Sequence, residues 1–185
     1  MRQAIFDANA NPGADTIVFQ GFASSGTLTL TEGALQVTES VDIVGPGQSD
    51  LTVSGGDSSG IFWFGGEVGT SDFSVSELTL NDGNGVTGAP LNGNFGGSVL
   101  FFDSQRAGGE DSLSLTNVTI QNSTSNRGGG ALHPEFGTLN IVDSSFINNT
   151  ATGTVEGGGA LSLLQTDCTV TRVTITGNSS NGRRS

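Results

Sequence analysis

The chain has 185 residues, 30 of them glycine and only 13% charged, which is enough for one domain or one stretch of a repeat protein. Its 6 basic residues oppose 18 acidic ones, leaving a net charge of -12. This balance argues against binding to nucleic acids, whose phosphates require a basic surface, and against docking on anionic membranes. The sequence has no apolar run long enough to insert into a bilayer and no visible signal peptide after Met1.

The first residues differ from the rest of the chain and predict a cap. Residues 2–10 place Ile5 and Phe6 on one side of a short helix, which Asn11-Pro12-Gly13 ends. A strand is expected to begin at Thr16. We therefore expect residues 1–16 to be an N-terminal capping segment for the repeats that follow.

Short apolar alternations follow the cap and predict strands, because side chains two residues apart share one face of a strand. Gly45-Pro46-Gly47 predicts a turn between two of them. These early strands are expected at residues 28–30, 35–37, 41–44, 51–53 and 61–64.

A degenerate repeat is visible in four segments that start at Phe73, Leu113, Leu139 and Cys168, and are therefore 40, 26 and 29 residues apart. Each segment has apolar or small residues at positions i, i+2, i+5 and i+7. The step of three between i+2 and i+5 would turn the apolar face of a straight strand outward. It therefore predicts a bend, at which Asn117 and Asp143 can adopt the left-handed conformation; Arg172 fits that position less well.

Glycine-led strands precede three of these segments, at residues 96–102, 128–132 and 157–164. A complete unit then has a glycine-led strand, a variable loop, two strands joined by a bend, and an asparagine-rich turn. One unit cannot bury its own apolar face, so the units must stack. The sequence predicts an all-β fold, a parallel β-helix of about five rungs over residues 17–180, followed by a tail at 181–185.

Asparagines recur after the last strand of each unit. If the rungs stack in register, Asn122, Asn149 and Asn178 are expected to form an inward ladder of side-chain hydrogen bonds at one corner. Cys168 aligns with Leu113 and Leu139, so a buried thiol is expected there.

Several of these segments resemble known families. Residues 1–19, together with 41–47 and 51–55, resemble the start of bacterial surface proteins with a CSLREA-type N-terminal motif. The Gly-Gly-Ala-Leu sequences at 129–132 and 158–161, with Phe146-Ile-Asn-Asn149, resemble the repeats of chlamydial polymorphic outer-membrane proteins.

This resemblance covers roughly residues 2–180. It implies a right-handed parallel β-helix of the pectin-lyase-like type, secreted or displayed on a bacterial cell surface. The chain departs from the pattern because the Cys-Ser-Leu portion is missing, and we interpret the tail as truncated.

The function we expect is non-catalytic: an adhesin-like or scaffold segment of a larger surface protein. Its expected partners are a glycan or a host or cell-surface protein, and we expect self-association through an uncapped C-terminal rung. The alternative is a polysaccharide-acting lyase or hydrolase, or a degenerate remnant of one. Against it, the sequence lacks lysine, a pair of arginines at neighbouring rung positions, an adjacent aspartate pair and a Gly-His-Gly motif.

The groups to inspect for a binding or catalytic groove are those of the variable loops. His133 and Glu135 are expected in such a loop. We expect no cofactor. Calcium is the alternative, because residues 81–85 and 109–112 contain clustered oxygen ligands. Neither segment matches a known calcium motif. The candidate binding residues are Asp103, Glu110, Asp111, His133 and Glu135.

Overall fold

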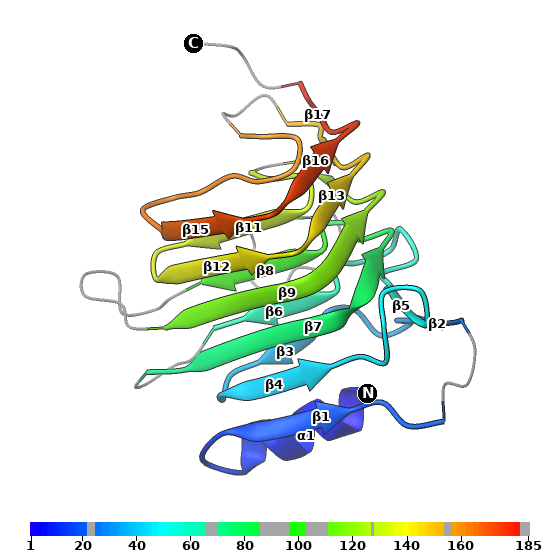
Figure 1. Ribbon diagram of the computed structural model, residues 1–185, viewed down its shortest axis with the longest axis vertical. Coiled ribbons are helices and arrows are strands. Elements are labelled where there is room, and N and C mark those ends of the chain that lie inside the picture. The colour runs from blue at the N-terminus through cyan, green and yellow to red at the C-terminus, as the bar shows by residue number, and fades with distance from the viewer. Residues whose placement is uncertain are drawn as a thin grey trace.

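The computed structural model describes residues 1–21, 25–65, 70–85, 97–102, 111–126, 128–153 and 157–181 (Figure 1). Short parallel strands stack into a β-solenoid of about 5 coils, with a helix at the N-terminal end. The predicted parallel solenoid of about five rungs is confirmed. The described elements are α1 (Arg2–Ala10), β1 (Asp15–Val18), β2 (Gly26–Thr29), β3 (Leu35–Val37), β4 (Val41–Val44), β5 (Leu51–Ser54), β6 (Phe62–Phe64), β7 (Asp72–Asn81), β8 (Val99–Phe102), β9 (Ser112–Gln121), β10 (Thr124–Ser125), β11 (Leu132–Glu135), β12 (Thr138–Val142), β13 (Ser145–Ile147), β14 (Thr150–Ala151), β15 (Asp167–Thr171), β16 (Thr174–Thr176) and β17 (Ser179–Ser180).

One long ladder runs the length of the molecule in the order β1-β4-β7-β9-β12-β15. We call it the front sheet (Figure 1). All its pairs are parallel and in register, so each position forms a column of side chains along the stack. Successive side chains of each strand point alternately into the core and out to solvent. One inward column contains Ile17, Ile43, Val75, Leu115, Ile141 and Val170.

The front sheet bends at the position that the repeat predicted. Asn117 and Asp143 have φ of 54° and 51°, and Glu77 and Arg172 occupy the same position in the neighbouring coils with φ of 57° and 53°. One left-handed residue restores the inward direction of the side chains after the odd step. The chain departs from the prediction in one respect, because β7 and β9 continue through this bend as single strands of 10 residues.

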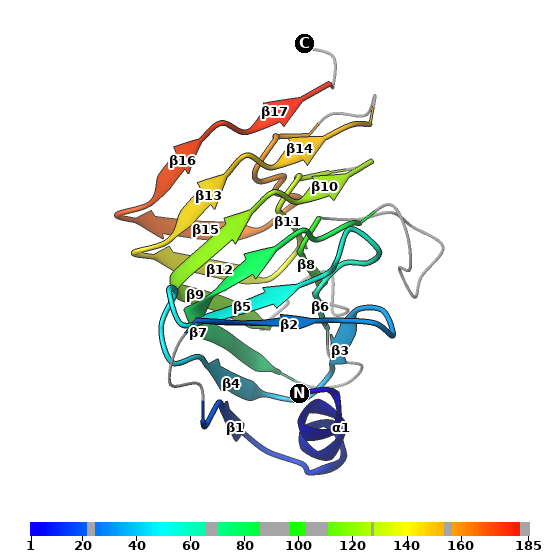
Figure 2. The same ribbon diagram turned by 90° about the vertical axis from the view of Figure 1, so that its right-hand side faces the viewer.

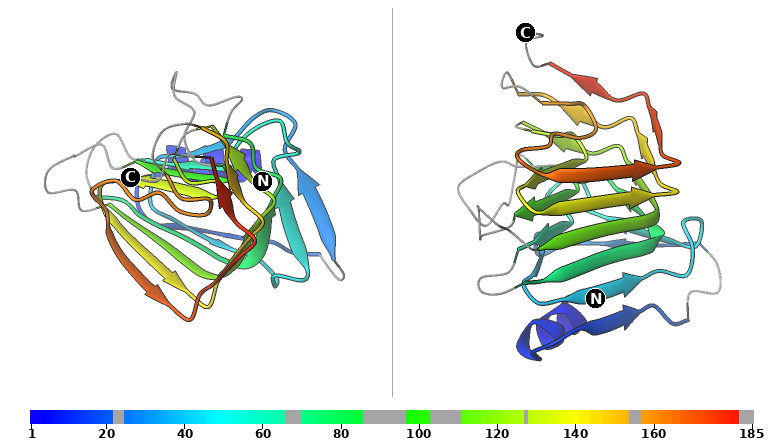
Figure 3. Two further views of the ribbon diagram at one scale, coloured as in Figure 1. Left: turned by 90° about the horizontal axis from the view of Figure 1, so that it is seen from above. Right: turned by 60° about the vertical axis from the view of Figure 1, so that its left-hand side comes forward.

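Three further ladders close the coil around one core (Figures 2 and 3). Beyond the bend, β2, β5, β13 and β16 pair alongside the second halves of β7 and β9. The order β3-β6-β8-β11 forms the back sheet, and the short strands β10-β14-β17 form a ladder that the sequence did not reveal. Four aromatic rings contact one another in sequence within the core, with centroids 5.2 Å, 5.2 Å and 6.3 Å apart, in the order Phe62, Phe64, Phe73 and Phe101; the first pair is stacked and the last is edge-to-face.

The glycine-led segments stack where neighbouring coils approach most closely. A Cβ added to Gly97 would overlap the carbonyl oxygen of Gly130, and one added to Gly130 would overlap that of Gly159. Only glycine allows the backbones to come this close. The Gly-Gly-Ala-Leu motif therefore has a packing origin: its glycines admit the next coil, and Ala131 and Leu132 are buried in the core.

We predict that Gly130→Ala destabilises the chain by about 1–3 kcal/mol, because the added methyl group must push two packed coils apart. Urea unfolding followed by circular dichroism measures this change. Gly60→Ala is the matched control, since its Cβ would meet its nearest neighbour at an ordinary 3.5 Å. Equal effects of the two substitutions would contradict the close packing at Gly130.

The helix α1 covers the back sheet at the N-terminal end of the solenoid. Ile5 and Ala8 are buried against the core. Asn9 hydrogen-bonds the backbone on both sides of Val37: its Nδ2 donates to the carbonyl of Gln36 at 2.9 Å, and its Oδ1 accepts from the amide of Thr38 at 2.9 Å. The cap is partial, because among the described residues the strand β1 pairs only with β4.

The last coil is more open than predicted. Instead of a strand at 157–164, the structure has isolated bridges at Leu161 and Leu164, which pair with Leu132 and Glu135. Leu163 and Leu164 are 46% and 45% exposed. The likeness of this segment to 128–132 therefore does not yield the same strand, because no described strand packs on its other side.

Candidate functional site

Of the predicted binding residues that the structure describes, His133 and Glu135 lie together and Asp111 contacts a different part of the chain. Asp103 and Glu110 lie outside the described residues. Asp111 is only 1% exposed, and its Oδ1 accepts a hydrogen bond from the amide of Ser71 at 2.7 Å. This contact joins neighbouring coils, so Asp111 is buried and not exposed in a groove.

His133 belongs to a strand and is buried, which corrects the expectation that it lies in a surface loop. It is the second residue of β11 and is 7% exposed. Leu132 and Pro134 continue the core columns of Val99 and Phe101, which leaves His133 and Glu135 on the outer side of the back sheet.

The His133 imidazole and the Glu135 carboxylate form a close pair, with Nε2 and Oε1 3.0 Å apart. The pair is nearly enclosed, since the two side chains are 9% and 16% exposed. Gly128, with φ of 73°, lies against the ring so closely that a Cβ there would collide with it. This arrangement holds the imidazole in one orientation, which a general base needs, but it also limits access to it.

The described residues show neither a cluster of metal ligands nor a membrane-spanning helix. They contain no group of three or more histidine, cysteine, aspartate or glutamate side chains placed to hold a metal ion. The only described helix, α1, is too short and too polar to cross a bilayer.

The corner asparagines form a ladder in two coils. The Oδ1 of Asn149 accepts from the amide of Ser123 at 3.0 Å, and the Oδ1 of Asn178 accepts from the amide of Asn149 at 2.8 Å. Asn149 also donates to the carbonyl of Ile120 at 3.0 Å. Each side chain thus binds the backbone of the preceding coil.

Asn122 does not belong to this ladder, which corrects the prediction for that residue. It is exposed and has φ of 53°, so it stacks with Asn148 at the neighbouring left-handed position. Ser123 occupies the inward position instead and is 0% exposed. The consecutive asparagines at 148 and 149 could have revealed the shift, because only one of two neighbours can point inward.

Polar side chains stack on the outside of the bend. Arg172 donates through Nε and Nη2 to both carboxylate oxygens of Asp143, at 2.5 Å and 2.7 Å. This hydrogen bonding, together with the charge of Arg172, lowers the pKa of Asp143. The pair explains why an arginine can occupy the bend: its side chain compensates for the left-handed backbone.

The Arg172–Asp143 pair predicts a pH effect that titration can measure. Arg172→Gln should raise the pKa of Asp143 towards its ordinary value of 3.8. Because the folded-state pKa is depressed, any stabilisation by this pair is present above the ordinary pKa and is lost as the pH falls through the folded value. NMR titration of the Asp143 carboxyl in both proteins would measure the shift; identical curves would contradict the contact.

Cys168 is only half-buried, which corrects the expectation of a buried thiol. It pairs in register with Leu139, which is 0% exposed. The difference arises because Cys168 belongs to β15, which among the described strands pairs only with β12. Partial burial raises the pKa of the thiol, so Cys168 is a poor nucleophile.

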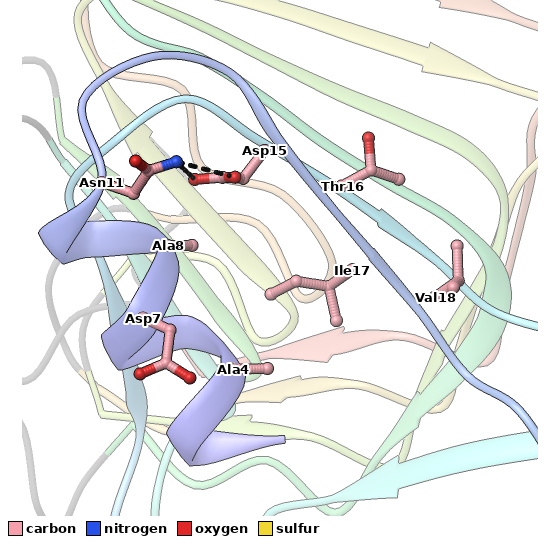
Figure 4. A pocket seen from close by; sticks show the side chains of 8 residues that line it. All are labelled: Ala4, Asp7, Ala8, Asn11, Asp15, Thr16, Ile17 and Val18. Atoms are coloured by element: carbon pink, nitrogen blue, oxygen red, sulfur yellow. Dashed lines mark hydrogen bonds between the residues drawn. The ribbon is translucent and has the colours of Figure 1, made fainter.

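A groove that the sequence did not reveal lies between α1 and β1, with a volume of about 530 Å³ (Figure 4). Its polar rim includes the Asn11 side chain, whose Nδ2 is 3.2 Å from both carboxylate oxygens of Asp15. The spacing of two alanines by four residues on the helix was the signal that could have indicated it. The lining residues are Ala4, Asp7, Ala8, Asn11, Asp15, Thr16, Ile17 and Val18.

The outer face of the front sheet presents polar side chains in register along the stack. Neighbouring coils are joined across it by side-chain hydrogen bonds, from Ser74 to Asp42 at 2.5 Å and from Ser112 to Asp72 at 2.6 Å. We call its central column the polar column: Thr16, Asp42, Ser74, Ser114, Asn140 and Thr169.

Comparison of the chain with protein-family models, curated proteins and solved structures found no match.

Proposed function

We propose that the chain is a non-catalytic, adhesin-like or scaffold segment of a bacterial surface protein, and that it binds a glycan on the outer face of the front sheet. The observation that carries this proposal is the polar column, in which six strands present short polar side chains in register. The resemblance of the N-terminal block and of the glycine-led repeats to surface proteins supports the location outside the cell.

The chemistry of the polar column suits an extended sugar chain. Neighbouring strands are about 4.8 Å apart, so hydroxyl, amide and carboxylate groups recur at a regular spacing along the stack. Such groups can donate to and accept from sugar hydroxyls. Asn140, with neither amide atom bonded in the described contacts, lies between Ser114 and Thr169, on the fifth of the six strands of this face.

The second candidate function is a polysaccharide-acting enzyme, and only the His133–Glu135 pair favours it. A glycoside hydrolase needs two carboxyl groups flanking the scissile bond, and a lyase needs a base that reaches a ring proton of the sugar. The remaining acidic candidate of the described structure, Asp111, is buried and occupied by the amide of Ser71. We therefore favour binding without turnover.

A glycan array and a cell-binding assay test the proposal, and acidic polysaccharides incubated with the chain test for released unsaturated products. We expect binding to some glycans, without product. Asn140→Arg should abolish this binding by blocking the polar column. The control Thr150→Arg, on β14 at another corner, should preserve it. Equal loss in both variants, or product release, would overturn the proposal.

A further inference from the structure

We propose that copies of this chain stack head to tail, with the strand β15 of one copy pairing in parallel with the strand β1 of the next. The proposal is independent of the glycan-binding function. It rests on the hydrogen-bonding pattern of the two terminal strands, on their side chains and on the charge of the two ends.

The front sheet has an open edge at each end. Among the described residues β1 pairs only with β4, and β15 pairs only with β12. Because every strand of this sheet runs in the same direction, a second copy placed above the first presents β1 to β15 in the parallel orientation. Association of two C-terminal ends would instead require antiparallel pairing, which the solenoid uses nowhere in its described part.

The two edges have complementary backbone groups. Each coil bonds to the coil before it through residues whose side chains point outward. Their backbone amides donate to carbonyls of residues whose side chains point inward, as from Ser112 to Ser71, Thr138 to Asp111 and Asp167 to Gly137. In a parallel ladder, residues of one parity bond to one neighbour and those of the other parity to the opposite neighbour.

The backbone amides and carbonyls at the two open edges follow the same pattern. At the upper edge, the inward residues Cys168 and Val170 have backbone groups that face away from β12. At the lower edge, Asp15 donates to Ser40 of the strand above, so the outward residues Thr16 and Val18 face away. Stacking therefore continues the existing pattern without a shift of register.

The side chains at the two edges also match. In a stacked copy, Thr16 would continue the polar column after Thr169, and Ile17 would continue the core column after Val170. Val170 is 49% exposed, whereas Ile141 in the coil before it is 0% exposed. The coil that contains Val170 buries Ile141, and a further coil would bury Val170 in the same way.

The charges of the two ends are opposite, which favours a head-to-tail contact over one between identical ends. Residues 157–185, which include the last coil, have three arginines and one acidic residue, for a net charge of +2, whereas residues 1–40, which include α1 and the first coil, have one arginine and four acidic residues, for a net charge of −3. The groove beside β1 contributes Asp7 and Asp15 to the acidic end. Such a heterologous contact does not close on itself, so it produces linear oligomers.

Sedimentation velocity across a wide range of concentrations tests the proposal on the full chain. We expect concentration-dependent oligomers that weaken as salt is added. Val18→Pro and Val170→Pro each replace one open-edge amide, which leaves pairing within the chain intact but blocks an incoming strand. Each variant alone should be monomeric, whereas an equimolar mixture should form a dimer, because each supplies the end that the other lacks.

Lysine variants provide a second test that leaves the backbone unchanged. Val170→Lys should abolish association because stacking would bury the charge, and Thr171→Lys is its matched control on the outward side of the same strand. A monomeric wild-type chain at all concentrations would overturn the proposal. So would dimers of Val18→Pro alone, which would indicate contact between C-terminal ends, or a mixture that stays monomeric while both variants retain the circular dichroism of the folded chain.

Discussion

Asn149→Ala should lower the free energy of unfolding by about 2–4 kcal/mol, measured by urea denaturation. The Asn149 side chain is 0% exposed and bonds the amide of Ser123 and the carbonyl of Ile120. Alanine would leave both backbone groups buried without these partners, and each unsatisfied group costs about 1–3 kcal/mol. The ladder would also lose one of its two asparagines, which bonds to Asn178.

Asn140→Ala is the matched control for this substitution, because Asn140 lies on the outer face of β12 and is half-buried. We expect it to change stability by no more than about 0.5 kcal/mol, as surface substitutions usually do. Asn149→Ser should have an intermediate effect, since a hydroxyl at this corner can still accept a hydrogen bond. Equal losses in Asn149→Ala and Asn140→Ala would show that the corner ladder does not stabilise the stack.

Ile120→Ala is expected to destabilise the chain by about 2–5 kcal/mol, because it leaves a cavity between packed coils. Ile120 is 1% exposed and lies in one column with Phe146 and Ile175. The same substitution at Ile175 removes the same atoms from a side chain that is 55% exposed. Ile175→Ala should therefore cost less than about 1 kcal/mol, since most of those atoms already contact water.

Comparing the two isoleucine variants tests whether the last coil is open, because both substitutions remove the same atoms. Chemical denaturation should be measured at a low protein concentration, where copies of the chain do not associate. A large loss at Ile175 would mean that the C-terminal coil is covered, and it would contradict the exposed position of this side chain.

The fold could be predicted because the repeat has a direct physical cause. A step of three between two alternations requires a bend, and the residues at that bend adopt positive φ at Asn117 and Asp143. The apolar positions on either side of it, such as Leu115 and Val118, are buried as the pattern requires. Glycine at closely packed positions such as Gly130 was similarly visible in the sequence, although its steric reason was not.

His133, Asn122 and Cys168 lie elsewhere than predicted, each for its own reason. His133 and Pro134 are uncommon in central strands, so their local preference indicated a loop; the stack overrides it, because β11 pairs with β8 over its whole length. Asn122 was assigned to the ladder because a single asparagine does not show which of two neighbouring residues points inward. Cys168 was expected to be buried by analogy with Leu139, but burial depends on a neighbouring coil as well as on the residue itself.

The candidate site was the least predictable part. An expected place in the variable loops suggested Asp111, His133 and Glu135 as candidates, yet Asp111 binds the amide of Ser71 and His133 pairs with Glu135. The polar column was not recognised either, although four of its six members follow the first residue of the aligned repeat segments; Thr16 and Asp42 lie outside that repeat. They come together only when the coils stack in register.

Residue-resolved amide hydrogen exchange, measured by NMR at low and at high protein concentration, tests the stacking of coils most directly. The amides of Thr169 and Thr171, which face β12, should be protected at both concentrations. Those of Cys168 and Val170, and of Thr16 and Val18 at the other end, should exchange fast in the dilute sample and become protected in the concentrated one. Protection of all residues of β15 in the dilute sample, or fast exchange of Cys168 and Val170 at both concentrations, would contradict this account.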